Sequence, residues 1–452
     1  MNTSTPVITR IAPSPTGLLH IGTARTALFN YLYARKHGGR FLIRIEDTDR
    51  ERSTMQYEQN ILEGLQRLGL EADGEIIRQS ERVERHTACL QQLVTENKAY
   101  ISREPARDDP TREVEVVRLR NNGAVITFRD EVRGDITFDT TELGDMVIAR
   151  NIHDPLYHFA VVVDDADMGV THVIRGDDHI SNTPRQILIQ EALDFPRPVY
   201  THLPLILATD RSKMSKRKGA VAISAYLEEG YLPETLVNFL ALMGWNDGTD
   251  KEVYRLPELV EAFSIEGIQK SGAVFDVEKL KWLNREHRKR LPEDTVRTML
   301  LTALHDQPVV AEIITRSVPA YEDLLERYAT TGDMCKALAE GEYDFYNTRP
   351  MVTREALVWK KDPEPEKAGE RLSILRARLL EISTETFLYD EVKSAVWDFA
   401  EQEGRGQVLW PLRYALSGRE KSPDPFLLLE ALGKEESLAR IDTAIAILTQ
   451  YT

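Results

Sequence analysis

An apolar run (residues 7–12) leads directly into the segment Pro-Ser-Pro-Thr-Gly-Leu-Leu-His-Ile-Gly-Thr (residues 13–23), after which apolar residues recur at helical spacing. The β-branched run predicts a buried strand that the prolines end, and the later spacing predicts a helix that Gly38-Gly39 ends. Such a turn directs backbone N–H groups and the positive end of the helix dipole toward a bound anion. Neither Gly-x-x-x-x-Gly-Lys-Ser/Thr nor Gly-x-Gly-x-x-Gly occurs in the required context, which excludes a P-loop and a dinucleotide-binding turn.

A second segment, Lys-Met-Ser-Lys-Arg-Lys-Gly (residues 213–219), follows a predicted strand nearly two hundred residues later. Activation of a carboxylate by ATP passes through a pentavalent α-phosphate, whose charge is neutralised by cations and Mg²⁺ without a protein nucleophile. Lys213 and Lys216 can supply such cations if the loop closes over the phosphates. A Lys- and Arg-rich loop is usually only solvated, but its position after a strand favours a functional role.

Three residues of the first segment complete the predicted ATP site. Gly17 and Gly22 let the backbone approach the phosphates, and His20, directly before the helix, can donate to a phosphate oxygen. A lone histidine before a helix is more often a cap, so the prediction rests on the motif as a whole. We therefore expect His20, Gly22, Lys213 and Lys216 to be the catalytic residues.

The alternation of strand and helix patterns predicts an α/β fold with a doubly wound parallel sheet of the Rossmann type. Further strands are expected at residues 41–45, 161–163, 171–174 and, as the last strand of the sheet, 204–207. Between residues 97 and 157 the alternation breaks, and hairpin-like runs predict an inserted α+β module. Beyond residue 219 nearly every pattern is helical, which predicts an all-α C-terminal region.

A net charge of −16 over 452 residues excludes indiscriminate, high-affinity coating of RNA, although basic stretches at 211–218, 285–290 and 371–378 allow local contacts. No apolar run reaches the length of a membrane span, and the N-terminal residues show no signal peptide. The two cysteines, Cys89 and Cys335, fit a reducing compartment and are too few for a typical structural zinc site. We expect a cytoplasmic protein that does not associate with a membrane.

Several segments resemble the bacterial-type glutamyl-tRNA synthetases, which are class I aminoacyl-tRNA synthetases. Residues 13–23 and 213–219 are similar to the HIGH and KMSKS signatures of that class. Three further segments resemble the glutamyl-tRNA synthetases in particular: Arg-Ile-Glu-Asp-Thr-Asp (44–49), Val-Val-Asp-Asp (162–165) and Val-Ile-Arg-Gly-Asp-Asp-His (173–179). The resemblance implies a glutamate–tRNA ligase that uses ATP with Mg²⁺, L-glutamate and tRNA(Glu). It also implies that glutamyl-adenylate forms only when tRNA is bound.

Free glutamate carries two carboxylates and one ammonium, and arginine side chains recognise carboxylates bidentately. Arg10 and Arg175, each at the end of a predicted strand, are therefore the expected carboxylate readers, and Glu46 can neutralise the ammonium. The alternative interpretation makes Arg44–Glu46 and Arg175–Asp177 structural ion pairs. The resemblance implies further pocket residues: Ala12, Ser14 and Tyr157 for glutamate, and Asp178 and Ile206 for ATP.

In many bacterial members of this family the insertion carries a Cys-x-Cys zinc site, whereas residues 97–157 contain no cysteine here, and we predict no zinc. We also expect a monomer. The resemblance implies the following organisation: residues 1–96 and 158–219 as the two halves of the catalytic domain, 97–157 as the insertion that holds the tRNA acceptor end, 220–292 as a helical stem-contact domain, and 293–452 as a helical anticodon-binding domain with a subdomain boundary near 350–365.

Other functions stay open. A glutaminyl-tRNA synthetase would share the ATP site, but a site for neutral glutamine disfavours a buried, unpaired guanidinium at Arg175. Known glutaminyl enzymes also carry β-barrels where this chain is helical, and transferases that act on a modified tRNA base lack the long C-terminal region. A catalytically silent paralogue that only binds tRNA would not need His20, Gly22 and Lys216, and all three are present. Whether tRNA(Gln) is charged as well as tRNA(Glu) is left open by the sequence.

Overall fold

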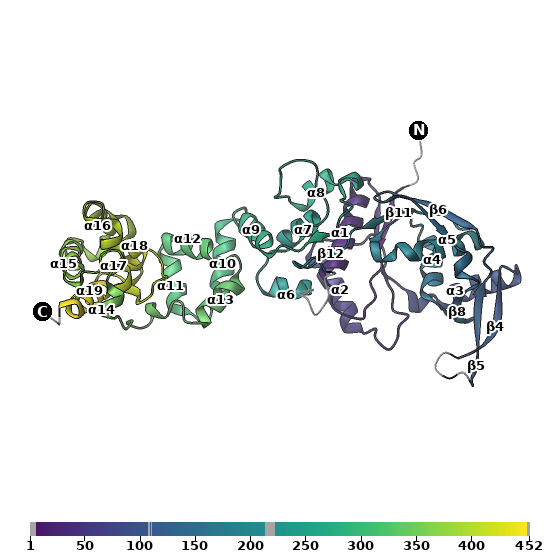
Figure 1. The fold of residues 1–452 in the computed structure, drawn as a ribbon, viewed down its shortest axis with the longest axis horizontal. Helices are drawn as coiled ribbons and strands as arrows, with labels where there is room; N and C mark the ends of the chain where they lie inside the picture. The colour runs from purple at the N-terminus through teal and green to yellow at the C-terminus, as the bar shows by residue number, and fades with distance from the viewer. Residues whose placement is uncertain (1–5, 107–108, 110, 213–221, 450–452) are drawn as a thin grey trace. The chain divides into compact units, whose positions relative to one another are not determined.

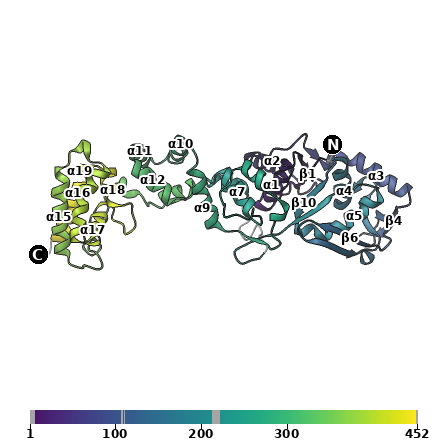
Figure 2. The ribbon, with the colours of Figure 1, turned by 90° about the horizontal axis from the view of Figure 1, so that it is seen from above.

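The computed structural model describes residues 6–106, 109, 111–212 and 222–449, so Lys213 and Lys216 lie outside the described residues. The chain divides into two compact units, Met1–His287 and Arg288–Thr452. Figures 1 and 2 draw both units with one colour scale along the chain. In the described part of the chain, no helix is both long and apolar enough to cross a membrane.

Parallel strands form the centre of the first unit (purple to teal in Figure 1). One group pairs in the order β1-β2-β3, and in the other β10 pairs with β11. The amide of Thr171, just before β10, donates to the carbonyl of Ile8 over 3.0 Å, so the two groups adjoin at β1 and β10. The bounds of these strands are β1 (Ile8–Ile11), β2 (Arg40–Ile45), β3 (Ile77–Arg78), β10 (His172–Gly176) and β11 (Val199–Leu203).

Helices cover both faces of these strands. On β10, Ile174 packs into one hydrophobic core with α1 (Ile21–Lys36), whereas its neighbour Val173 packs into another core with α4 (Tyr157–Asp167) and α5 (Thr183–Ala192). Successive side chains of a strand point to opposite faces, so the two cores lie on opposite sides of the sheet. The predicted α/β fold with a doubly wound parallel sheet is confirmed.

Two strand predictions are wrong. Residues 161–163 lie in α4, where every residue from Phe159 to Asp165 is buried. The apolar run of this helix is therefore continuous and lacks the one-sided periodicity that identifies a surface helix. The expected last strand at 204–207 also differs, because β11 ends at Leu203 and the following β12 (Ile206–Leu207) pairs with β13 (Ala273–Val274).

The strands of residues 97–157 belong to two different sheets. An antiparallel sheet in the order β4-β5-β8-β9 contains most of them. The β6–β7 hairpin instead joins β11, where Asp130 pairs with Tyr200, so this hairpin extends the central sheet. The bounds are β4 (Ala99–Pro105), β5 (Glu113–Leu119), β6 (Val125–Asp130), β7 (Gly134–Asp139), β8 (Met146–Asn151) and β9 (Asp154–Pro155).

Helices from beyond residue 222 bury the far side of α1, and their side chains share one hydrophobic core with it. This packing holds the first turn of α1, which begins at Ile21 within the 13–23 segment, in a fixed place. The other helices of the first unit are α2 (Met55–Arg67), α3 (Val83–Thr95), α6 (Ile223–Glu228), α7 (Pro233–Leu242), α8 (Leu256–Ala262) and α9 (Val277–Arg288), the last of which reaches the unit boundary.

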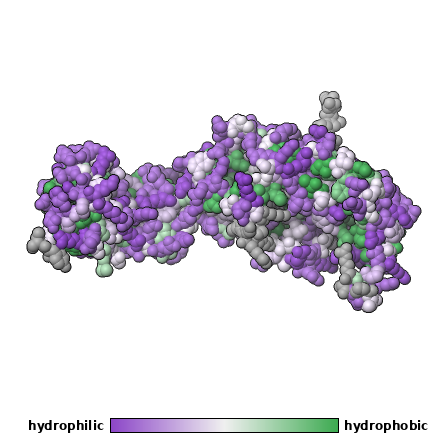
Figure 3. All heavy atoms as spheres, viewed as in Figure 1, coloured by the Kyte–Doolittle hydropathy of each residue, from purple (hydrophilic) through white to green (hydrophobic). Residues whose placement is uncertain are grey.

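The second unit is helical in its described residues, and one hydrophobic core includes residues from Val296 to Leu448. That core contains residues on both sides of 350–365, and the subdomain boundary expected there stays a prediction. On the face shown in Figure 3 the surface of this unit is mainly hydrophilic. Its helices are α10 (Glu293–Ala303), α11 (Pro308–Arg316), α12 (Val318–Arg327), α13 (Thr331–Ala339), α14 (Arg354–Leu357), α15 (Pro365–Glu381), α16 (Tyr389–Glu403), α17 (Arg405–Ser417), α18 (Pro425–Leu432) and α19 (Lys434–Thr449).

Candidate active site

A cleft of about 520 Å³ lies in the first unit, at the carboxyl ends of β1 and β10 and the start of α1. This edge of a parallel sheet is where ligands commonly bind. The predicted site residues that belong to the described part of the chain all line this cleft: Arg10, Ala12, Ser14, Gly17, His20, Gly22, Glu46, Tyr157, Arg175, Asp178 and Ile206. The structure therefore brings them together, while their individual roles stay predictions.

His20 is the N-cap of α1. Its Nδ1 accepts from the amides of Gly22 (3.1 Å) and Thr23 (3.3 Å), and its Nε2 lies 3.0 Å from the Thr23 hydroxyl. In the neutral ring an accepting Nδ1 places the proton on Nε2, where it can be donated. A Cβ at residue 22 would lie 3.1 Å from the ring, so glycine leaves room for this cap. The expectation that the first amides of α1 point at a bound anion is thus corrected for Gly22 and Thr23, whose N–H groups His20 occupies.

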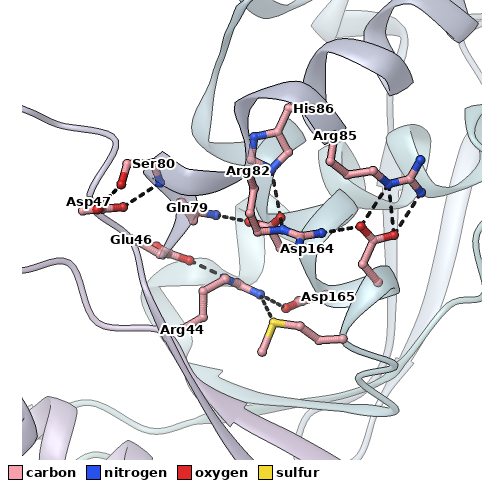
Figure 4. A network of polar contacts seen from close by, with 12 residues as sticks. Arg44, Glu46, Asp47, Gln79, Ser80, Arg82, Arg85, His86, Asp164 and Asp165 are labelled. Carbon is pink, nitrogen blue, oxygen red and sulfur yellow. Dashed lines mark hydrogen bonds and ion pairs between the residues drawn. The ribbon is translucent and has the colours of Figure 1, made fainter. Parts of the chain in front are cut away.

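Arg10 and Glu46 belong to a buried cluster of ion pairs. Asp165 on α4 accepts from Arg10 (Nε to Oδ1, 3.2 Å) and from Nη1 of Arg44. Nη2 of Arg44 lies 3.2 Å from Oε1 of Glu46 (Figure 4). The structural ion pair considered for Arg44 and Glu46 is therefore present. Both Arg10 and Glu46 already have a protein partner before any ligand binds.

Burial and pairing act in opposite directions on the two carboxyl groups of this cluster. Burial raises the pKa of Glu46, and the guanidinium of Arg44 offsets this only in part. Burial also acts to raise the pKa of Asp165, but Arg10 and Arg44 together outweigh it and hold that pKa below its ordinary value. Asp165 therefore stays charged at neutral pH.

A second group of polar side chains contacts α4 at Asp164, the residue before Asp165. The fully buried Asp164 accepts from Nε of Arg82 at 2.6 Å and from Nε2 of Gln79 at 2.9 Å, and it lies 2.8 Å from Nε2 of His86 (Figure 4). Sequence reasoning did not find these contacts. The available signal was the pair of adjacent aspartates inside a buried apolar run, since buried carboxylates require partners.

Arg175 differs from the other arginines of the cleft, because its partners are neutral. Its Nη1 donates to Oε1 of Gln186 (2.7 Å), its Nη2 to Oγ1 of Thr183 (2.7 Å), and its Nε to Nε2 of His202 (3.1 Å). Among the described residues no carboxylate lies within ion-pairing distance of it. The alternative ion pair with Asp177 is absent from the structure, where Asp177 pairs with Arg133. Burial lowers the pKa of Arg175, whose exposed fraction is 6%.

Tyr157 begins α4 and faces the same cleft. Its hydroxyl lies 3.3 Å from Nδ1 of His179, and burial raises its pKa to about 12, so the phenol stays neutral and can donate. Asp178 lies close to the backbone of Gly176, where an added Cβ would meet Oδ1 of Asp178 at 2.6 Å. The chain thus follows a tight path where β10 ends, and this path brings His179 and Asp178 into the cleft.

Arg25 also lines the cleft, and sequence reasoning missed it. Its Nη1 donates to the carbonyl of Met243 over 3.2 Å and its Nη2 to the carbonyl of Pro204, while its Nε has no hydrogen-bond partner among the described residues. Burial lowers its pKa to about 10. The spacing of Arg25 could have indicated that it faces the cleft, because it lies three residues after Gly22, on the same side of the helix.

The charged side chains of the cleft differ in their partners. Some pair with one another, namely Arg10, Arg44, Glu46 and Asp165. Arg25 donates to two backbone carbonyls, whereas Arg175 donates to neutral side chains. An uncompensated buried guanidinium is costly, and an anionic ligand would remove that cost. The arrangement at Arg175 fits a ligand with a carboxylate group.

The cleft at the strand ends, the capped helix after the 13–23 segment and the helical second unit together define a class I tRNA synthetase. The family described as tRNA synthetases class I (E and Q), catalytic domain, matches residues 6–110 and 107–282, and the anticodon binding domain family matches residues 294–445. The chain belongs to this class I family. Family membership implies the use of ATP with a divalent metal. Among the described residues, no group of three or more His, Cys, Asp or Glu side chains is arranged to hold a metal ion.

Within that family the similar proteins are glutamate–tRNA ligases. The chain is 41% identical to glutamate–tRNA ligase 1 of Syntrophus aciditrophicus, with 97% of each protein covered. It is 38% identical to the glutamate–tRNA ligase of Thermodesulfovibrio yellowstonii, with 96% of this chain and 98% of the relative covered. A crystal structure of a glutamate tRNA ligase from Elizabethkingia meningosepticum in complex with its amino acid superposes with a TM-score of 0.83, at 28% identity over 98% of this chain and 100% of that one.

Proposed function

We propose that this chain is a glutamate–tRNA ligase. It activates L-glutamate with ATP to glutamyl-adenylate and pyrophosphate, and then transfers the glutamyl group to the 3'-terminal adenosine of tRNA(Glu). The full-length similarity to glutamate–tRNA ligases and the match to both domain families support the reaction. The glutamine-specific reaction is the alternative within the same family.

The buried Arg175 is the observation that favours glutamate. Its guanidinium is buried and has only neutral hydrogen-bond partners. The second carboxylate of glutamate can pair with this guanidinium, whereas the neutral amide of glutamine would leave the buried charge uncompensated. Arg10, Ala12, Ser14, Glu46 and Tyr157 complete the proposed glutamate pocket.

For the activation step we propose positioning and charge neutralisation rather than covalent catalysis by the protein. His20 keeps its ring proton on Nε2, which lies 3.0 Å from the Thr23 hydroxyl, and Gly22 makes room for the ring. MgATP enters as a substrate between this helix start and the residues near Asp178 and Ile206. Lys213 and Lys216, outside the described residues, would neutralise the phosphates.

The finer assignments of partner, location and cofactor belong to the same proposal. We expect a cytoplasmic monomer that binds tRNA(Glu) and needs Mg²⁺ but no zinc. Both cysteines are free, which fits a reducing compartment. Charging of tRNA(Gln) is a separate question, which side-by-side assays with purified tRNA(Glu) and tRNA(Gln) decide.

The test is to replace the buried charge of Arg175. Arg175→Met removes it while keeping an apolar stem, and the KM for glutamate should rise at least about tenfold because a charge-assisted hydrogen bond is lost. Arg197→Met is the matched control, since Arg197 is exposed and paired with Glu191 outside the cleft. Both variants and the unchanged chain are assayed for glutamylation of tRNA(Glu). An unchanged KM in Arg175→Met, or charging with glutamine but not glutamate by the unchanged chain, would refute the proposal.

A further inference from the structure

We propose that Asp130 and His202 act together as positioning residues for Arg175, and that His202 does so through a neutral imidazole in one tautomer. The inference rests on the proposed function, because it concerns how the glutamate-reading arginine is held. Neither residue lines the cleft, and neither was singled out by sequence reasoning. Their role follows from an unbroken chain of buried contacts that ends at Arg175.

The contacts run across three strands. Asp130 ends β6, His202 lies in β11 and Arg175 lies in β10. Nδ1 of His202 is 2.7 Å from Oδ2 of Asp130, and Nε2 of His202 accepts from Nε of Arg175 at 3.1 Å. The side chains of Asp130 and His202 are wholly buried, and Arg175 is 6% exposed. The imidazole therefore fills the space between the carboxylate and the guanidinium.

The contact with Arg175 determines the tautomer of His202. A guanidinium can only donate, so Nε2 of His202 must be unprotonated, and the ring proton lies on Nδ1, where it is donated to Asp130. Asp130 is in turn fixed by the backbone, since Oδ1 accepts from the amides of Val132 (3.0 Å) and Arg133 (2.8 Å), and Oδ2 accepts from the amide of His202 (3.0 Å). These bonds leave one orientation for the ring.

A histidine next to Arg175 affects the charge of the guanidinium differently from a carboxylate. A carboxylate in direct contact with Arg175 would neutralise it and compete with the substrate for the same donors. The neutral ring satisfies Nε by hydrogen bonding and keeps the carboxylate of Asp130 out of direct contact with Arg175. Gln186 and Thr183, also neutral, hold Nη1 and Nη2 in the same way. The guanidinium is thus oriented without being neutralised.

Protonation of His202 would remove the acceptor that Arg175 needs. Burial lowers the pKa of His202 below its ordinary value although Asp130 acts to raise it, so the neutral ring prevails at pH 7. The charged or titratable groups around the ring are Asp130 on β6, Arg175 on β10, Asp177 and His179 after β10, and Tyr200 on β11. Affinity for glutamate should therefore fall only at a pH below the ordinary pKa of a histidine.

Two amide substitutions separate the contacts of the two ring nitrogens, of which Nε2 also lies 3.2 Å from the Thr183 hydroxyl. In His202→Gln the amide oxygen reaches the place of Nε2 and can accept from Arg175, whereas in His202→Asn the amide nitrogen reaches only the place of Nδ1 and donates to Asp130. The KM for glutamate should stay within about threefold of the unchanged chain in the Gln variant and should rise about 10- to 100-fold in the Asn variant. The KM for ATP should change less than about threefold in both.

The full-length variants are compared in glutamylation of tRNA(Glu), with thermal unfolding as a check of folding. A second measurement does not depend on the Asn variant: when the pH is lowered from 8 to the lowest value at which the chain stays folded, the KM for glutamate should rise more in the unchanged chain than in His202→Gln. Equal KM values in both variants, or the same pH response with and without His202, would overturn the positioning role. If the unchanged chain failed to charge tRNA with glutamate, the proposed function itself would fail, which is a different result.

Discussion

The stability of the catalytic unit should depend strongly on Asp165. The substitution Asp165→Asn keeps the shape of the side chain but removes the charge that Arg10 and Arg44 share. At 3.2 Å and an effective dielectric constant of about 20, the Arg10 contact alone corresponds to about 5 kcal/mol of gross attraction. Much of this offsets desolvation, and the measured cost of removing one partner of a buried pair is about 3–5 kcal/mol.

The assay is calorimetric unfolding of the full chain, in which the transition of the first unit is followed. At about 2 °C per kcal/mol for a unit of this size, the midpoint should fall by about 6–10 °C. Asp154→Asn is the control. Asp154 pairs with Arg150 through side chains that are 43% and 63% exposed, and such pairs contribute little to stability. A midpoint within about 2 °C of the unchanged protein would refute the reasoning.

The stability difference between the unchanged protein and Asp165→Asn should also depend on pH. The pKa of Asp165 is lower in the folded than in the unfolded chain, so its stabilising contribution is complete above the ordinary pKa of an aspartate and is lost as the pH falls through the folded value. The difference in unfolding free energy between the unchanged protein and Asp165→Asn should therefore stay constant from pH 8 to about 5 and shrink below about pH 4. A difference that grew on acidification would contradict the assigned sign.

Two further outcomes are expected. Gly22→Ala places a Cβ 3.1 Å from the His20 ring, so the cap of α1 should weaken by about 1 kcal/mol. Adenylate formation, measured as ATP–pyrophosphate exchange with tRNA present, should therefore slow by about five- to tenfold. An unchanged exchange rate would show that the ring position does not matter. Treatment with a zinc chelator, followed by assay with excess Mg²⁺, should leave glutamylation unchanged, and a loss that added zinc restores would contradict the predicted absence of a zinc site.

The parts of the fold that sequence reasoning predicted are those with local signals. The turn at residues 13–23 combines prolines, glycines and a change from strand to helix periodicity, and the structure places a strand and α1 on its two sides. The α4 helix was misread because its residues are buried on nearly all sides, which removes the periodicity on which the distinction depends.

The contacts that organise the cleft could not be predicted, because they join distant parts of the chain. Arg10 and Asp165 are 155 residues apart, and His202 and Asp130 are 72 apart. Residue chemistry indicated which side chains suit a carboxylate ligand, but not which of them already have a partner. The pairing of Arg44 with Glu46 and the neutral partners of Arg175 became apparent only from the three-dimensional arrangement.

The difference between Arg10 and Arg175 bears on how the cleft distinguishes an acidic from a neutral amino acid. A ligand carboxylate that approaches Arg10 also approaches Asp165, the carboxylate that Arg10 and Arg44 share. A carboxylate that approaches Arg175 meets a guanidinium whose partners are all neutral, so the full attraction is available to it. A neutral amide at the same place gains a hydrogen bond but leaves the buried charge uncompensated. We therefore expect discrimination between glutamate and glutamine to depend more on Arg175, and on the side chains that keep it oriented and charged, than on Arg10.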